Sequence, residues 1–431
     1  MRSPSRTFRR WWCRRKWAAD VGALTPTFLH QAQRPDRRHF EILAYAWAGW
    51  VFDFYDLMLF SFLLIPLGRE FGFSKLDLSW VLGASLGATA VGGVIFGALA
   101  DRFGRRSVLQ WTILTYSIGT FLCGLAPGFA WLMAFRVVTG LGVGGEWATG
   151  QAYVSESFPP NVRGRYSAYM QTGAPVGVAL AAVMGGFLAP EIGWRACFLI
   201  SAMPAVLVIA MRRRLPESDL WLANRLPSRS GTFAPLLTGA HRGAFLRCLI
   251  LTTFTMSSYW FTYSWLPGYL FDQRHMSMAR SASWILVTQS GGFLGYLSFG
   301  FVADRWGRRP AFTVYSVVFA VGLAMITVFF NSIGSAPALL LAFMFLVGLG
   351  TGVWSGFGPL FAELFPTAIR NTAMGAAYNI ARGVQFFTPV VITLIARRFG
   401  LAGGMSVAAF FAVATAAWIW TFEETKGKVL A

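Results

Sequence analysis

The amino-acid sequence predicts an all-α integral membrane protein, with twelve transmembrane helices in two six-helix halves and both termini in the cytoplasm. Three observations support this prediction. First, 55% of the 431 residues are hydrophobic and only 13% are charged, whereas soluble domains carry about 25% charged residues. Second, long apolar segments recur along the whole chain. Third, an arginine-rich motif occurs once in each half of the chain.

Each apolar segment is long enough to cross a bilayer as a helix. A hydrocarbon core of roughly 30 Å needs about 20 helical residues. Strands of membrane barrels alternate over ~10 residues instead, a pattern that these segments lack. The expected spans, in chain order, are residues 42–67, 77–100, 107–126, 129–154, 166–189, 192–211, 247–270, 281–303, 310–330, 336–360, 372–396 and 401–422.

The spans divide the chain into regions. We expect a basic cytoplasmic tail at 1–40, a first half at 41–211, a cytoplasmic linker at 212–246, a second half at 247–422 and a cytoplasmic tail at 423–431. For the first tail two interpretations stay open, a basic helix on the membrane surface or a disordered segment.

The distribution of Lys and Arg predicts the topology. If both termini are cytoplasmic, 28 of the 37 Lys and Arg residues lie on the cytoplasmic side, seven lie on the opposite side and two lie within spans. This is the positive-inside pattern, and it favours a multi-pass protein of a bacterial inner membrane. The net charge of +19 sits next to the membrane, where anionic lipids attract basic residues. We therefore expect membrane lipids, and no nucleic acid, as partners.

A repeated motif marks the turns after the second and eighth spans. Its residues recur 203 positions apart, and a Glu and an Arg after spans four and ten recur 207 positions apart. Glycine permits a tight turn, and the Asp can pair with an arginine. Two copies predict a pair of loops that switch with conformation. Their residues are Gly97, Asp101, Arg102, Gly104, Arg105, Arg106, Glu156 and Arg163, and then Asp304, Arg305, Gly307, Arg308, Arg309, Glu363 and Arg370.

These loops resemble the signature of the major facilitator superfamily, and Arg136-x-x-x-Gly140-x-Gly142 resembles its second motif. The resemblance covers residues 40–427 and implies a secondary transporter that works by alternating access, with a substrate site between the halves near the bilayer midplane. Within the superfamily, three segments are similar to the metabolite, aromatic-acid and sialate/lactate proton symporters. They are Asp53-Phe-Tyr-Asp56, Gly145-Glu146-Trp147 and Trp265-Leu-Pro267-x-Tyr269.

Two other segments, Leu215-Pro-Glu217-Ser218 and Glu424-Thr-Lys426-Gly427, are similar to sugar porters. Both depart from the sugar-porter pattern, since Asp219-Leu220 replaces proline-arginine and Phe422-Glu423 replaces a proline. The sequence therefore favours proton-coupled symport of a small organic anion, a carboxylate. A sugar or polyol porter and a metabolite or drug exporter remain alternatives.

Four charged residues in the first half are candidates for proton coupling, because charges in the bilayer core are costly and tend to be functional. Asp53 and Asp56 are three residues apart and share a helix face. Either can be the proton carrier, and the alternative is that one of them is a fixed partner for an arginine or a helix end. The resemblance links Arg136 to proton transfer. Glu146 lies ten residues later, about 15 Å along the helix, so the two cannot pair. Glu146 is a second proton site or a bond partner within the bundle.

Arg382 is the candidate anchor for the substrate anion, because a guanidinium binds a carboxylate through two parallel hydrogen bonds. A buried ion pair with an Asp of the first half is the alternative, and the two can compete. The other candidate substrate-binding residues are polar or aromatic side chains predicted to lie in spans, Asn379, Gln385, Tyr259, Tyr263, Gln289 and Trp354.

The sequence contains no clustered nucleophile, no metal-ligand spacing and no phosphate-binding glycine loop. We therefore expect neither an enzyme nor an ATP-driven pump, with no metal and no cofactor other than protons as the coupling ion. A monomer is sufficient for this mechanism.

Overall fold

The computed structural model describes residue 29 and residues 34–159, 163–206, 215–219, 222, 241–333, 336–365 and 367–425. Every regular element in these ranges is helical. Most of the predicted first tail, most of the linker and the end of the last tail lie outside the described residues, as do the side chains of Asp101, Arg163 and Arg370.

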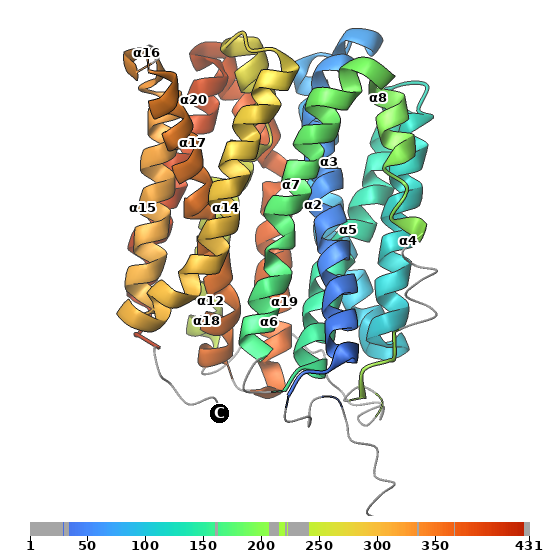
Figure 1. The fold of residues 1–431 in the computed structure, drawn as a ribbon, viewed down its shortest axis with the longest axis vertical. Coiled ribbons are helices and arrows are strands. Elements are labelled where there is room, and N and C mark those ends of the chain that lie inside the picture. The colour runs from blue at the N-terminus through green and yellow to red at the C-terminus, as the bar shows by residue number, and fades with distance from the viewer. Residues whose placement is uncertain are drawn as a thin grey trace, which may run out of the picture.

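The first part of the chain forms a helical bundle. Its elements are α2 (Arg37–Phe71), α3 (Lys75–Phe103), α4 (Arg105–Gly124), α5 (Phe129–Ser157), α6 (Arg163–Gln171), α7 (Gly173–Val183), η2 (Met184–Leu188) and α8 (Ala189–Ile200). Helix α5 packs against α3, α4 and α2, and α2 packs against α7. Figure 1 shows these helices side by side on one side of the molecule.

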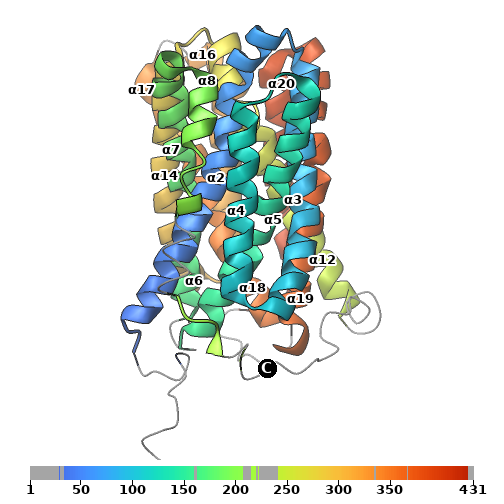
Figure 2. The same cartoon turned by 90° about the vertical axis from the view of Figure 1, so that its right-hand side faces the viewer.

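The second part repeats this arrangement. Its elements are α12 (Arg242–Tyr263), α13 (Leu266–Gly268), η3 (Tyr269–Gln273), α14 (Met278–Trp306), α15 (Arg308–Thr327), α16 (Phe330–Ile333), α17 (Pro337–Gly350), η4 (Thr351–Gly356), α18 (Phe357–Leu364), α19 (Thr367–Val384), η5 (Gln385–Phe387), α20 (Thr388–Trp418) and η6 (Ile419–Thr421). Helix α17 packs against α14 and α15, and α20 packs against α12 and α15. The two parts meet where α3 contacts α19 and α20, and where α7 contacts α14 (Figure 2).

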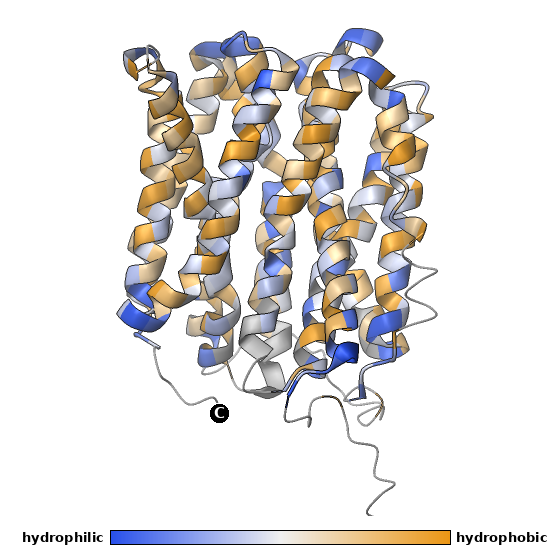
Figure 3. Cartoon of the chain, viewed as in Figure 1, coloured by the Kyte–Doolittle hydropathy of each residue, from blue (hydrophilic) through white to orange (hydrophobic). Residues whose placement is uncertain are grey.

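Seven helical stretches in the described residues are long and apolar enough to cross a membrane, by length and composition. Hydrophobic residues dominate the outward-facing helices, and hydrophilic residues gather at the two ends of the molecule (Figure 3). This distribution suits a bundle whose sides contact lipid tails and whose ends contact water. The helical runs bend at Gly193 and Gly400. Gly400 lies between the predicted spans 372–396 and 401–422, whereas Gly193 is the second residue of the predicted span 192–211.

Backbone conformation repeats along the chain as the sequence motif does. All positive φ angles in the described residues fall into three pairs, Gly72 with His275, Gly104 with Gly307 and Gly193 with Gly400. The pairs are 203, 203 and 207 positions apart, the same separations that the motifs show. The repeat in the sequence is therefore also a repeat of the fold.

Candidate functional site

The five charged residues that the sequence places deep in the membrane are all buried. Asp53, Arg136 and Glu146 are 0% exposed, Arg382 is 1% exposed and Asp56 is 2% exposed. They come from α2, α5 and α19, helices that face the contact between the two parts of the bundle. Since isolated charges are costly to bury, their partners determine what each can do.

Asp56 is held in a buried ion pair with Arg136, whose Nε has no hydrogen-bond partner among the described residues. Nη1 of Arg136 donates to Oδ2 of Asp56 at 2.8 Å, and Thr120 donates to the other carboxylate oxygen. Nη2 of Arg136 donates to Ser85 at 3.1 Å, and the guanidinium carbon lies 4.7 Å from the ring centre of Phe60. Of the two alternatives for the aspartates, a fixed arginine partner therefore describes Asp56.

Asp53 has different surroundings, although it lies one turn away on the same helix. Neither of its carboxylate oxygens has a hydrogen-bond partner among the described residues. The charged groups that interact electrostatically with the Asp53 carboxylate are Glu146, Arg382 and Asp56. An unbonded carboxylate between one cation and two acids is placed to gain and lose a proton.

Glu146 lies on the same side of α2 as Asp53. Thr112 donates to its Oε2 at 2.8 Å, whereas Oε1 has no hydrogen-bond partner among the described residues. A methyl group added to Gly49 would lie 1.9 Å from Oε1, so the carboxylate rests directly on that glycine. Because Gly49 precedes Asp53 by one helical turn, the two acids are neighbours. The ten-residue spacing predicts that Glu146 and Arg136 do not pair, and in the structure Arg136 pairs with Asp56 instead.

Arg382 faces this acid pair from α19. Its Nη1 has no hydrogen-bond partner, and no ion pair of Arg382 is present in the part of the chain that the structure describes. Its guanidinium carbon lies 5.8 Å from the ring centre of Tyr378. The alternative prediction, a hydrogen-bonded ion pair with a first-half Asp, is not found in this conformation.

Aromatic rings lie around Arg382. Tyr259 and Tyr263 stack on each other with their centres 4.4 Å apart. The rings of Trp147 and Tyr378 stack at 3.8 Å, and Trp354 meets Tyr378 edge-on at 6.1 Å. Trp147 belongs to a motif in the sequence but is not among the predicted site residues, and Tyr378 is not predicted at all. Its position four residues before Arg382, on the same helix face, is the signal that could have found it.

The three predicted amide side chains differ in how their polar atoms are used. Gln385 donates to Ser257 and to the carbonyl of Ala381 and accepts from Thr388, so its bonds are made within the second half. Asn379 donates to the carbonyl of Gly375 at 3.0 Å. Gln289 keeps an Nε2 without a partner among the described residues. Gln289 is therefore the amide with a donor to spare.

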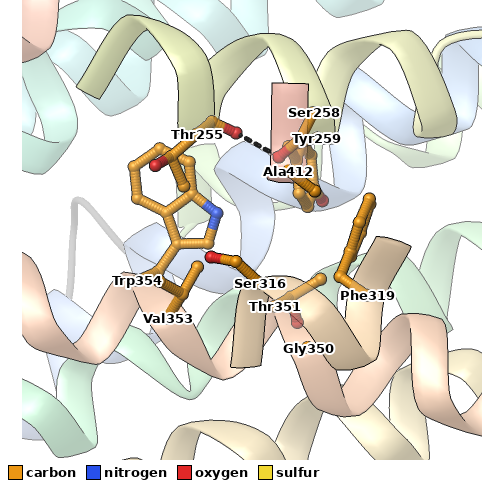
Figure 4. Close-up of a pocket in the computed structure, with 10 residues that line it drawn as sticks. All are labelled: Thr255, Ser258, Tyr259, Ser316, Phe319, Gly350, Thr351, Val353, Trp354 and Ala412. Carbon is orange, nitrogen blue, oxygen red and sulfur yellow. Dashed lines mark hydrogen bonds between the residues drawn. The ribbon is translucent and has the colours of Figure 1, made fainter. Parts of the chain in front are cut away.

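A small cavity of about 10 Å³, large enough for about one water, lies beside Tyr259 and Trp354. Tyr259 and Trp354 line it together with the hydroxyl groups of Thr255, Ser258, Ser316 and Thr351 (Figure 4). Two of the predicted substrate-binding residues thus meet at one cavity.

The two parts of the bundle are also joined at the end where α3 begins. Lys75 forms an ion pair with Asp272 of η3 at 2.7 Å, and Ser79 and Thr393 share a hydrogen bond of 2.5 Å. The backbone and ring of Phe386 lie directly against Gly83 and Gly87 of α3. This end of the molecule, called the outer closure below, is shut.

The arginine-rich loops at the other end form two matching networks. Arg105 pairs with Glu156 at 3.0 Å, and Arg308 pairs with Glu363 at 2.9 Å and with Asp304 at 3.0 Å. Each network includes a further glutamate and a hydroxyl that the motif did not contain. Ser218 donates to Glu156 at 2.6 Å, Thr425 donates to Glu363 at 2.5 Å, and the backbone N–H groups of Arg106 and of Arg308 and Arg309 donate to Glu217 and Glu424.

Two predicted loop residues have other surroundings. Gly97 lies inside α3, and a methyl group added to it would meet no atom within 4 Å, so it does not form the turn. The guanidinium of Arg102 lies 5.2 Å from the ring centre of Phe103. The turn itself is made by Gly104 and by Gly307, whose φ angles are 98° and 102°.

Comparison with known proteins gives the family. The model of the Major Facilitator Superfamily matches residues 46–299, and that of sugar and other transporters matches residues 228–431. The chain is 30% identical to the sialic acid transporter NanX of Escherichia coli, over 88% of this chain and 92% of that protein. It is 31% identical to the cis,cis-muconate transport protein of Acinetobacter baylyi, over 87% and 90%.

Among solved structures, the chain resembles that of the xylose transporter XylE of E. coli, which was solved in a partially occluded inward-open conformation. The TM-score is 0.75 at 20% identity, with 92% of this chain and all of that chain covered. At this identity the likeness concerns the fold alone. The helical bundle, its internal repeat and these matches agree, and the chain belongs to the Major Facilitator Superfamily as a multi-pass inner-membrane transporter, not an enzyme.

Proposed function

We propose that this transporter is a proton-coupled symporter of a small organic anion. The observation that carries the proposal is the juxtaposition of Asp53 and Arg382, both buried and both with unbonded polar atoms. Burial of charged groups without full hydrogen bonding is costly. Such an arrangement is expected where a ligand and a proton supply the missing partners during the transport cycle.

A carboxylate is the substrate class that this site fits best. Arg382 offers a guanidinium, which matches a carboxylate through two parallel hydrogen bonds, and the rings of Tyr259, Tyr263 and Trp354 offer apolar contact for the rest of the molecule. Sialic acid and cis,cis-muconate, named for the two relatives, are both carboxylates. The match to the sugar-transporter model makes a sugar the alternative outcome of the test.

The coupling follows from competition for Arg382. With Asp53 ionised, its carboxylate attracts the arginine and weakens the binding of an anion. When Asp53 gains a proton, Arg382 is released to bind the substrate, and the loaded carrier can change conformation. Glu146 is a second proton site beside it. Asp56 and Arg136 remain paired and hold α2 against α5.

The membrane arrangement belongs to the same proposal. Twelve spans, both termini in the cytoplasm and the region boundaries given above follow the hydropathy and the positive-inside pattern. The outer closure then faces the periplasm, and the arginine-rich loops face the cytoplasm and its lipids. The carrier acts as a monomer without a cofactor, and protons are the coupling ion.

The test uses proteoliposomes that contain a pH-sensitive dye. A panel of carboxylates and labelled sugars is added outside, and acidification of the lumen is followed against empty liposomes. We expect acidification with one class of carboxylate, and its loss in Arg382→Ala. Sugar entry with no response to any acid would overturn the proposal.

The Asp53→Asn variant tests the coupling step. It keeps the shape of the side chain but cannot carry a proton, so we expect loss of concentrative uptake while exchange of labelled for unlabelled substrate continues. Concentrative uptake that persists in this variant and in Asp53→Asn combined with Glu146→Gln would contradict the assignment.

A further inference from the structure

A stacked pair of rings joins the two parts of the bundle next to the proposed site. Trp147 of α5 and Tyr378 of α19 have ring centres 3.8 Å apart and ring planes at 12°. Both side chains are buried, at 6% and 7% exposure. The pair is therefore a direct contact between helices that must separate if the two parts move apart.

The position of the stack is fixed by the directions of the two helices. Helix α5 ends close to Glu156 and α19 begins shortly after Glu363, and both glutamates belong to the arginine-rich loop networks. Tyr378 precedes Arg382 by four residues, about 6 Å along the helix. Trp147 likewise lies on the loop side of Glu146. The stack thus separates the Asp53, Glu146 and Arg382 cluster from the end of the molecule that carries the loops.

The two rings can separate and come together again at low cost, because no hydrogen bond joins them. The indole Nε1 of Trp147 has no hydrogen-bond partner among the described residues, so the two rings are in contact by stacking. Separating them breaks no hydrogen bond between the two parts. The outer closure, by contrast, holds an ion pair and a hydroxyl–hydroxyl bond across the same interface.

Trp147 is also bonded through the backbone to Glu146, the acid that lies on Gly49. The geometry links the proton-binding acid to the cross-bundle stack through one peptide unit.

We propose that the Trp147–Tyr378 stack is the inner gate of the transporter, closed in this structure, and that Trp147 is the positioning residue that ties gate opening to Glu146. This inference rests on the proposed function. A gate of this kind prevents substrate from passing without its proton.

The experiment measures substrate flux and proton flux together in proteoliposomes, for Trp147→Ala and Tyr378→Ala, with Trp147→Phe and Tyr378→Phe as matched variants that keep a ring. We expect the Ala variants to leak, so that substrate moved per proton rises by about tenfold and concentrative uptake is lost. The Phe variants are expected to keep the wild-type ratio. An unchanged ratio in the Ala variants, with only KM raised, would overturn the gate and make the rings a binding wall.

A second measurement decides the case if the Ala variants do not fold. The variants Trp147→Leu and Tyr378→Leu remove the rings but keep apolar bulk between the helices. We expect the same rise in substrate moved per proton in these variants, and a wild-type ratio in both would overturn the proposal. If the wild type transports no acid at all, the proposed function itself fails, which is a separate outcome.

Discussion

At the scale of single residues, Asp53 and Asp56 show how neighbours on one helix can have different roles. Both are buried acids three residues apart, but only Asp56 has an arginine and a threonine as hydrogen-bond donors. A fully bonded carboxylate stabilises the fold in its ionised form. A carboxylate without donors is cheaper to protonate, because it loses no hydrogen bonds in doing so.

The unfolding stability of variants should separate these roles. We expect Asp56→Asn to lower the free energy of unfolding by about 3–5 kcal/mol, since it leaves the Arg136 charge buried without its partner. Asp53→Asn breaks no hydrogen bond of the described residues, and we expect its stability to equal or exceed that of the wild type. Thermal unfolding in detergent measures both. Adding Arg136→Gln to Asp56→Asn should recover part of the loss, and equal destabilisation by the two single variants would contradict the assignment.

At the scale of elements, the starts of α4 and α15 are built alike. Each follows a glycine with a φ near 100°, and neither has a side-chain cap from its own N-cap residue. Glu217 and Glu424 instead accept hydrogen bonds from the first backbone N–H groups of these helices. An acid is favourable there because the N-terminus of a helix carries partial positive charge. The segments that resemble sugar porters thus act as distant helix caps.

Two glycines of the second motif copy should differ in their tolerance of alanine. Gly307 has φ 102° and ψ 166°, and an added methyl would lie 2.7 Å from Glu424. Because this backbone region belongs almost only to glycine, we expect Gly307→Ala to destabilise the protein by about 1–3 kcal/mol. Gly300→Ala meets no atom within 4 Å and serves as the control, with no loss expected. Thermal unfolding of both variants provides the measurement, and equal effects would rule out backbone strain.

At the scale of the whole molecule, contacts between the two parts of the bundle lie on both sides of the proposed site. The outer closure contains Lys75 and Asp272, whose side chains are 52% and 29% exposed. An ion pair this exposed adds little to overall stability. Two conformations of a transporter differ by only a few kcal/mol, however, so even a weak bond that exists in one of them shifts their populations.

Charge reversal at the outer closure should therefore open it. In Asp272→Lys the new charge repels Lys75, and we expect a cysteine introduced at the buried Thr393 to react about fivefold faster with a membrane-impermeant thiol reagent from outside. Combining Asp272→Lys with Lys75→Asp restores the attraction between the two side chains. In this double variant we expect the cysteine at position 393 to react as slowly as it does when Lys75 and Asp272 are both unchanged. If both variants react at the same rate as the parent, the ion pair does not contribute to closure.

Much of the fold could be predicted from the sequence, because hydropathy and charge are local properties. Segments of ~20 apolar residues specify membrane helices, and the same arginine-rich motif at two places specifies a repeat. The five deep charges could also be found in this way, since a charge within an apolar segment is conspicuous. The structure buries all five of these residues, Asp53, Asp56, Arg136, Glu146 and Arg382, and their roles in transport stay predictions.

What the sequence by itself determined, then, is the class of protein, its helices, its internal repeat and the charged residues that avoid lipid. Only the tertiary structure decided which residues meet. It paired Arg136 with Asp56 and left Asp53 unbonded, stacked Trp147 on Tyr378 and brought Glu217 and Glu424 to the starts of distant helices. The physical reason is that helical periodicity fixes the face on which a side chain lies, whereas contacts between distant helices depend on how those faces pack together.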